Sequence, residues 1–170
     1  MIVVNYFGPP GSGKSSMATG LFSRLKFLNV SCEITNEYAK DLTWEDRHVA
    51  LANQWLVSST QLHRMRRLEN KVDFIINDSP LLLGVIYYQG TNPYFKDAFL
   101  HEFNQYSNIN YYIDRVKPYH QAGRFHSEKE SEELGVSLKA FLKENDIPYT
   151  TIPGRESELD SMVERILKEN

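Results

Sequence analysis

Cysteine is almost absent from the chain, which contains only Cys32. One cysteine cannot form an internal disulfide or build a cysteine-rich zinc site, so a reducing intracellular compartment is favoured. Long hydrophobic runs are also missing, since none approaches the roughly 18 apolar residues that a membrane span requires. The opening residues MIVVNYFG have no basic stretch and are typical of a strand rather than a secretory signal. We therefore expect a cytoplasmic protein, of a bacterium or a phage-infected host, without membrane association.

Neither sign of charge is in large excess: 19 Lys and Arg against 22 Asp and Glu give a formal net charge of −3. This mild acidity argues against a protein that coats nucleic acid or an anionic membrane, although a local basic groove remains open. Repeats, low-complexity tracts and Pro-, Ser- or Gly-rich linkers are lacking as well. We therefore expect one globular domain over residues 1–170, as a monomer or a homodimer.

Short apolar runs alternate with longer periodic stretches, which is typical of repeated β-α-β units. Strands are expected over residues 2–7, 32–37, 72–77, 109–113 and 149–152. Helices are expected over residues 14–28, 44–70, 94–106, 127–145 and 159–167, with a break near Ser58-Ser59 as an open alternative. This pattern predicts an α/β fold whose parallel sheet is covered on both faces and binds ligands at the carboxyl ends of its strands.

The most specific motif is a complete G-x-x-x-x-G-K-[ST] octet between the first strand and the first helix. Its glycines let the backbone curl so that N–H groups point at phosphate oxygens, and the helix N-terminus adds positive potential. Lys14 would place its charge on the β- and γ-phosphates, and the Ser15 hydroxyl would be a ligand of Mg²⁺. We expect ATP and Mg²⁺ to bind at Gly8, Pro9, Pro10, Gly11, Ser12, Gly13, Lys14, Ser15 and Ser16.

Two acids lie at the carboxyl ends of predicted strands and are candidates for catalysis and for contact with the acceptor, since Glu37 is the last residue of the strand 32–37. Asp78 closes the strand 72–77 and is followed by Ser79, where ATPases of the AAA type commonly have a Glu that polarises water. The missing Glu favours phosphoryl transfer to a bound hydroxyl over hydrolysis. Asp78 would hold Mg²⁺ or accept the hydroxyl proton, and Glu37 is the other candidate base.

The polar segment 115–127 is predicted to be a lid. Its Arg115 and Arg124 would stabilise charge on phosphate oxygens, because a guanidinium is planar and permanently charged. A closed lid would also exclude water and suppress hydrolysis.

The acceptor pocket is expected between the second strand and the helix that follows it. Gln61 would face this pocket and bond a base or amide edge, and Tyr38 would supply a ring for stacking. The basic run His63–Arg67 on the same helix is either a solvated face or a contact with a nucleic-acid backbone.

Together, GPPGSGKS, Asn36-Glu37-Tyr38-Ala39, the Gln-bearing helix and Asp78-Ser79-Pro80-Leu81-Leu82 resemble small P-loop kinases. Over nearly the whole chain they are similar to the ribosylnicotinamide kinase domain of the bacterial NAD regulator and to its phage-encoded relatives, which are described as AAA-type ATPases. The resemblance implies a three-layer P-loop kinase fold that has a five-stranded parallel sheet of order 2-3-1-4-5 and binds MgATP. By motif position it implies roles for Gly11, Gly13, Lys14, Ser15, Glu37, Gln61, Asp78 and Arg124.

The chain departs from that family at Asp78-Ser79-Pro80, where the cognate kinase has Asp-Thr-Asp and thus one more acidic group near the acceptor. We therefore expect a MgATP-dependent phosphotransferase for a nucleoside- or nucleotide-like acceptor. Two alternatives stay open at this point. One is a kinase acting on hydroxymethylated pyrimidine bases in phage DNA, and the other is a regulatory P-loop ATPase or nucleotide switch.

Overall fold

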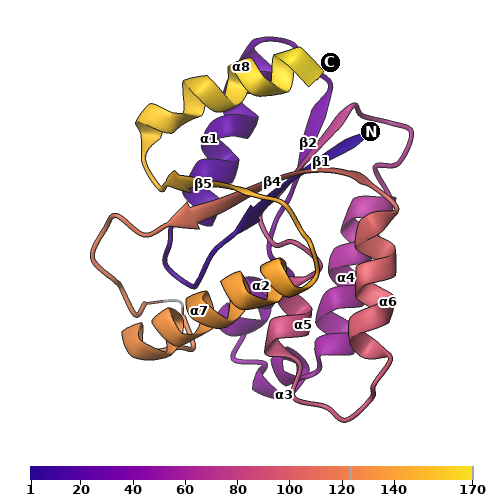
Figure 1. The fold of residues 1–170 in the computed structure, drawn as a ribbon, viewed down its shortest axis with the longest axis vertical. Helices are drawn as coiled ribbons and strands as arrows, with labels where there is room; N and C mark the ends of the chain where they lie inside the picture. Colours follow the sequence, from indigo (N-terminus) through magenta and orange to yellow (C-terminus); the bar gives the residue numbers. More distant parts are fainter. Residues whose placement is uncertain (123, 170) are drawn as a thin grey trace.

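A parallel sheet forms the centre of a computed structural model that describes residues 1–122 and 124–169 (Figure 1). In these residues the strand order is β2-β3-β1-β4-β5, and every neighbouring pair is parallel, as predicted. The carboxyl ends of all the strands therefore meet at one edge of the sheet. The strands are β1 (Ile2–Phe7), β2 (Cys32–Thr35), β3 (Phe74–Asn77), β4 (Ser107–Asp114) and β5 (Thr150–Pro153).

Helices cover both faces of the sheet (Figure 1). One face carries α1 (Lys14–Phe27) and α8 (Leu159–Glu169), with the short 3-10 helix η1 (Glu156–Glu158) before α8. The other helices are α2 (Tyr38–Trp44), α3 (His48–Ala52), α4 (Gln54–Arg66), α5 (Leu83–Tyr87), α6 (Phe95–Asn104) and α7 (Glu128–Glu144). None of the helices within the described ranges is both long enough and apolar enough to cross a membrane.

Alternation along the strands explains why both faces are buried. In β1, Val4 and Tyr6 pack against α1 and α8, whereas Val3 and Phe7 belong to the clusters on the opposite face. All four side chains are fully buried. A strand that is buried on both faces shows a continuous apolar run in the sequence, which is why this strand could be predicted to the residue.

The predicted helix over residues 44–70 is wrong, because the structure has three helices between residues 38 and 66. Asp46 adopts a left-handed φ of 54° after α2, and the Asn53 side chain accepts the Leu56 N–H at 3.2 Å to start α4. The break thus lies well before Ser58-Ser59. The second strand is also shorter than predicted, since it ends at Thr35 and leaves Glu37 as the N-cap of α2. Helices of five to seven residues are too short to show a clear period, so α2, α3 and α5 were not predicted.

The N-terminus of α7 confirms the predicted capping box. The Ser127 hydroxyl accepts the Glu130 N–H at 3.3 Å, and the Glu130 carboxylate accepts the Ser127 N–H at 2.7 Å. These reciprocal bonds satisfy two backbone donors at the helix start. They fix the residue at which the segment 115–127 ends.

Ser127→Ala is expected to lower the free energy of unfolding by about 1 kcal/mol, because it removes the N-cap acceptor. Ser137→Ala is the matched control, since Ser137 lies on the same helix and bonds only the carbonyl oxygen of Glu133. Urea denaturation of both variants measures the difference. Equal losses would mean that the cap does not hold this helix terminus.

Candidate active site

The phosphate-binding loop of residues 8–15 leaves the central strand β1 and runs directly into α1 (Figure 1). Its curl depends on left-handed backbone at Gly11, with φ 77°, and at Gly13, with φ 105°. The Lys14 ammonium donates to the carbonyl oxygens of Gly8 and Pro9 at 2.9 and 3.1 Å. The loop therefore holds a positive charge at the end of the strand and the start of a helix, where phosphate binds best.

Lys14, Glu37 and Asp78 meet at the carboxyl edge of the sheet. Burial lowers the pKa of the Lys14 ammonium, and the charges of Glu37 and Asp78 oppose that shift. Burial raises the pKa of Glu37, which Lys14 lowers and Asp78 raises further. One cation and two acids thus share a space that is partly removed from water, where their mutual interactions are strong.

Asp78 has an unsatisfied carboxylate oxygen. Its side chain is only 5% exposed, and Oδ1 has no hydrogen-bond partner among the described residues. A buried carboxylate oxygen is costly unless a donor or a cation meets it. Ser15, in the first turn of α1, brings a hydroxyl to the same end of the sheet. A hydroxyl and a carboxylate suit Mg²⁺, which is typically bound through one or two such oxygens together with substrate phosphates.

The segment 115–127, called here the lid segment, joins β4 to α7 and lies over the phosphate-binding loop; residue 123 lies outside the described residues. The Tyr119 ring packs directly on Gly11, because a methyl group there would come within 2.9 Å of a ring carbon. The same point is 3.4 Å from Nε of Arg124, whose guanidinium lies 5.6 Å from the Tyr119 ring centroid. Arg124 also contributes to lowering the pKa of Lys14, after the larger effect of burial. The structure therefore places Arg124 beside the phosphate-binding loop.

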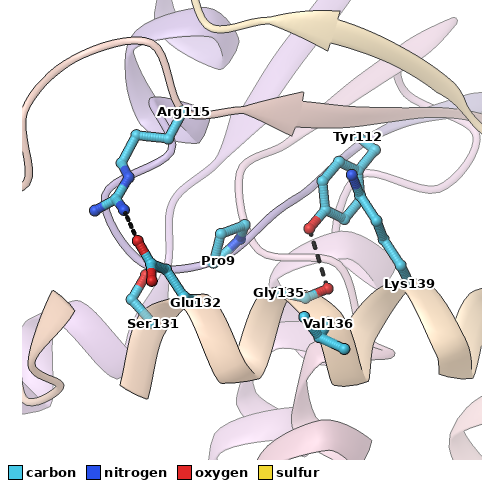
Figure 2. Close-up of a pocket in the computed structure, with 8 residues that line it drawn as sticks. All are labelled: Pro9, Tyr112, Arg115, Ser131, Glu132, Gly135, Val136 and Lys139. Atoms are coloured by element: carbon cyan, nitrogen blue, oxygen red, sulfur yellow. Dashed lines mark hydrogen bonds and ion pairs between the residues drawn. The ribbon is translucent and has the colours of Figure 1, made fainter. Parts of the chain in front are cut away.

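Arg115 lies at the other end of the lid segment and is paired differently. Figure 2 shows its side chain directed at Glu132 on α7, in a pocket of about 300 Å³ beside Pro9. Its guanidinium nitrogens lie 2.8 Å from Glu132 and 3.0 Å from Glu128. Lys14 and the two acids are not among the residues that line this pocket. Arg115 thus anchors the lid segment to α7, while Arg124 faces the phosphate-binding loop.

Helix α7 also supports the phosphate-binding loop directly. The Ser131 hydroxyl donates to the carbonyl oxygen of Pro10 at 2.8 Å. One turn further along, the Gly135 carbonyl oxygen accepts from the Tyr112 hydroxyl at 3.2 Å, beside Pro9 (Figure 2). The loop therefore rests on a rigid helix as well as on its own strand.

Gln61 lies near the site, but both ends of its carboxamide are used within the protein. Its oxygen accepts the Tyr38 N–H at 3.3 Å, and its nitrogen donates to Oδ1 of Asn77 at 3.2 Å. The Tyr38 ring is in turn covered by the Arg64 guanidinium, 5.2 Å from the ring centroid. Gln61 and one face of the Tyr38 ring are therefore already engaged in contacts within the protein.

Other side chains offer unused polar groups on this side of the sheet. Oε1 of Gln54 and Oγ of Ser58 are buried on α4 without a hydrogen-bond partner among the described residues. Both approach α5, since a methyl group at Gly84 would lie 2.0 Å from Oγ of Ser58 and 3.7 Å from Oε1 of Gln54. Tyr87 at the end of α5 has its pKa raised by burial and then by the charge of Glu37. Gln54 and Ser58 on α4 and Tyr87 on α5 are therefore further candidates for contact with an acceptor.

The basic run His63–Arg67 does not present three free arginines. Arg64 binds Asp41 at 2.7 Å and the carbonyl oxygen of Asn36 at 2.9 Å. Arg66 binds Glu102 at 2.6 Å, and Arg67 donates to the Arg64 carbonyl oxygen at 3.2 Å. The run is thus largely used to join α4 to α2 and α6.

Sequence reasoning missed Tyr119, Gln54, Ser58 and Asn77. The sequence does contain a signal for Tyr119, because it is an aromatic residue in the mainly polar lid segment. Asn77 was another, because an amide at a buried strand position needs a partner. Gln54 and Ser58 gave no such signal, because the helix that contains them was predicted to begin at residue 44 rather than at Gln54.

Comparisons with known proteins agree with this architecture. A family model described as an AAA domain matches residues 3–158. No curated protein matches the chain significantly. The narrower resemblance to ribosylnicotinamide kinases stays a prediction.

Solved structures of deoxyadenosine kinase from M. mycoides are similar in fold. The form with the products dCMP and a flexible dCDP has a TM-score of 0.60 at 19% identity, over 99% of this chain and 98% of that chain. The form with bound dATP gives 0.59 at 19% identity over the same shares. The form with bound dCTP gives 0.58 at 16% identity, over 98% and 97%. The expected P-loop kinase fold and its strand order are therefore confirmed.

Glu37→Gln is expected to increase the free energy of unfolding at pH 7. The pKa of Glu37 is raised above its ordinary 4.5 in the folded protein. As the pH rises through 4.5 the unfolded chain loses its proton first, so the wild type loses stability relative to the neutral variant. Denaturation between about pH 4 and pH 8 should show a gain that grows with pH and levels off above the raised pKa.

Glu164→Gln, at an exposed position of α8, is the control and should show little pH-dependent change. A loss of stability in Glu37→Gln at pH 7 would mean that the attraction of Lys14 outweighs the burial of the carboxylate.

Proposed function

The chain belongs to the AAA-domain family, and we propose that it is a kinase that transfers the γ-phosphoryl group of ATP to a hydroxyl of a nucleoside-like acceptor. The observation that carries the proposal is the partly buried acid Glu37, whose charge interacts with those of Lys14 and Asp78 near the phosphate-binding loop. A carboxylate in this position is suited to accept a proton from a hydroxyl nucleophile. Hydrolysis would need an acid that orients water, whereas Asp78 is followed by Ser79.

In the proposed reaction, Lys14 binds the β- and γ-phosphates and Arg124 reaches them from the lid segment. The acceptor O–H gives its proton to Glu37 as its oxygen bonds to phosphorus, and the bond to the ADP oxygen breaks. Mg²⁺, held with ATP by Ser15 and Asp78, would neutralise charge on the phosphate oxygens. Tyr119, which packs on Gly11 of the phosphate-binding loop, would help to exclude water from the reacting groups.

The acceptor class follows from the groups beyond Glu37. The unpaired Oε1 of Gln54 and Oγ of Ser58 would accept or donate hydrogen bonds to the polar edge of a base or sugar. Tyr87 at the end of α5 adds an aromatic ring, which lies 5.6 Å from the His126 ring of the lid segment. The similar M. mycoides structures contain dATP, dCTP or dCMP, which supports a nucleoside over an unrelated alcohol. The paired arginines of α4 give no specific support for DNA as the acceptor.

Product analysis by mass spectrometry tests the proposal. The purified protein would be incubated with MgATP and nucleosides, nucleoside monophosphates, nicotinamide riboside, and DNA duplexes with and without hydroxymethylpyrimidines. We expect one phosphoryl group to be added to a free nucleoside or nucleotide. Transfer only to modified DNA would replace the acceptor class, and ADP release without any phosphorylated acceptor would favour the regulatory ATPase.

Lys14→Ala should abolish most transfer, because it removes the charge that binds both terminal phosphates. We expect a loss of about 10²-fold or more in kcat/KM. The matched control is Lys168→Ala, an exposed residue near the end of α8. Near-normal transfer by Lys14→Ala would contradict the assigned nucleotide site.

The two lid arginines should separate in their effects. Arg124→Ala is expected to lower kcat about tenfold or more while changing the affinity for ATP much less, since it acts on charge that develops during transfer. Arg115→Ala should instead lower Tm, with a smaller effect on kcat, because it breaks the ion pairs to Glu128 and Glu132. Steady-state kinetics and thermal unfolding measure both. Equal kinetic effects would contradict the division between the two residues.

A further inference from the structure

A row of polar side chains crosses the buried sheet on the face covered by α4. Its members, called here the polar row, are Thr35, Asn77, Asn5 and Asn110. They occupy paired positions on β2, β3, β1 and β4, because Thr35 lies opposite Asn77, and Asn5 lies opposite both Asn77 and Asn110. Each is at most 6% exposed.

The hydrogen bonds of the polar row all run in the same direction. Thr35 donates to Asn77 at 2.9 Å, and Asn77 donates to Asn5 at 3.1 Å. Asn5 donates to Asn110 at 3.0 Å, and Asn110 donates to the carbonyl oxygen of Pro148 at 2.9 Å. Every carboxamide in the row is thus used as donor and as acceptor.

Gln61 joins the polar row to the active site. Its nitrogen donates to the same Asn77 oxygen that accepts from Thr35. Its oxygen accepts the N–H of Tyr38, the first residue of α2. Glu37 immediately precedes Tyr38, and Asp78 immediately follows Asn77. One short chain of hydrogen bonds therefore connects the two backbone segments that carry the acids.

Apolar side chains would fill the same space without needing partners. Buried hydrogen bonds contribute little net stability, but they constrain direction and distance more closely than apolar packing does. The Glu37 end of this connection lies beyond the backbone ladder, since β2 ends two residues earlier. Arg64 also holds this segment from α4, through the carbonyl oxygen of Asn36 and the carboxylate of Asp41. The amide of Gln61 supplies a restraint where the backbone ladder stops.

We propose that Gln61 and Asn77 are positioning residues, which hold Glu37 at a fixed distance from Asp78 and Lys14 through the Tyr38 N–H. The inference rests on the proposed function, because it assigns these residues an effect on phosphoryl transfer. Gln61 then acts through the protein backbone rather than through contact with the acceptor. The far end of the polar row, at Asn110, has no such connection to an acid.

The test compares Gln61→Met with Asn110→Leu. Both replace a buried carboxamide by an apolar side chain of similar size and break two hydrogen bonds of the same network. Gln61→Met should lower kcat about tenfold with the KM for ATP unchanged, because the base is misplaced while the phosphate-binding loop is intact. Asn110→Leu should lower Tm and leave kcat within about twofold of the wild type. Equal kcat values for the two variants would overturn the proposal.

Hydrogen exchange at the Tyr38 amide supplies a readout that needs no activity. Gln61→Met should speed this exchange about tenfold relative to the amides of β1, whereas Asn110→Leu should not. Unchanged exchange at Tyr38 in Gln61→Met would overturn the proposal, even if kcat fell. A wild-type protein that phosphorylates no acceptor would refute the proposed function alone, and the exchange rates would still decide whether Gln61 restrains the start of α2.

If Gln61→Met fails to fold, Thr35→Val removes only the second donor to the Asn77 oxygen and keeps the side-chain shape. It should lower kcat by about threefold, with the KM for ATP unchanged. An unchanged kcat in a folded Thr35→Val protein would count against the proposal.

Discussion

One ammonium and two carboxyl groups crowd together at the carboxyl edge of the sheet, and much of the remaining structure serves that arrangement. Burial penalises the ionised forms of both Lys14 and Glu37, because it lowers the pKa of the ammonium and raises the pKa of the carboxyl group, and the opposite charge of the other group opposes each shift. The three residues come from segments that follow or leave β1, β2 and β3, which lie side by side. A parallel sheet brings such distant segments to one edge, and the helices and the lid segment then limit the access of water.

The two faces of the sheet differ in the side chains that they bury. Several buried polar atoms lack a hydrogen-bond partner among the described residues, and three of them are Oδ1 of Asp78, Oε1 of Gln54 and Oγ of Ser58. The face covered by α1 and α8 holds a large apolar cluster that includes Leu21, Leu25 and Ile166, together with the Tyr6 hydroxyl from the same set of atoms. Unsatisfied groups that collect at a binding site are expected where binding, rather than folding, provides the missing partners.

Local patterns predicted the parts of the molecule whose causes are local. The phosphate-binding loop, β1, α1 and the capping box of α7 depend on neighbouring residues, and their positions follow from the sequence. The division of residues 38–66 into three helices depends on a left-handed Asp46 and a single capping bond at Asn53, which periodicity does not reveal. The two lid arginines look equivalent in the sequence. They differ because Arg115 forms ion pairs with Glu128 and Glu132 on α7. Similarly, the partner of Gln61 is a residue on β3, and that pairing exists only after the sheet has formed.

The strand order has a consequence for how the chain is made. β1 lies in the middle of the sheet, but its partners are β3 and β4, and Ile2 pairs with Phe74 on one side and with Ser107 on the other. During synthesis β1 is therefore made well before either of the strands that pair with it. Contacts of such long sequence separation form slowly, and the apolar β1 stays exposed to other chains until they do. The phosphate-binding loop begins at the end of this strand, so its surroundings are completed only after β3 and β4 have been made.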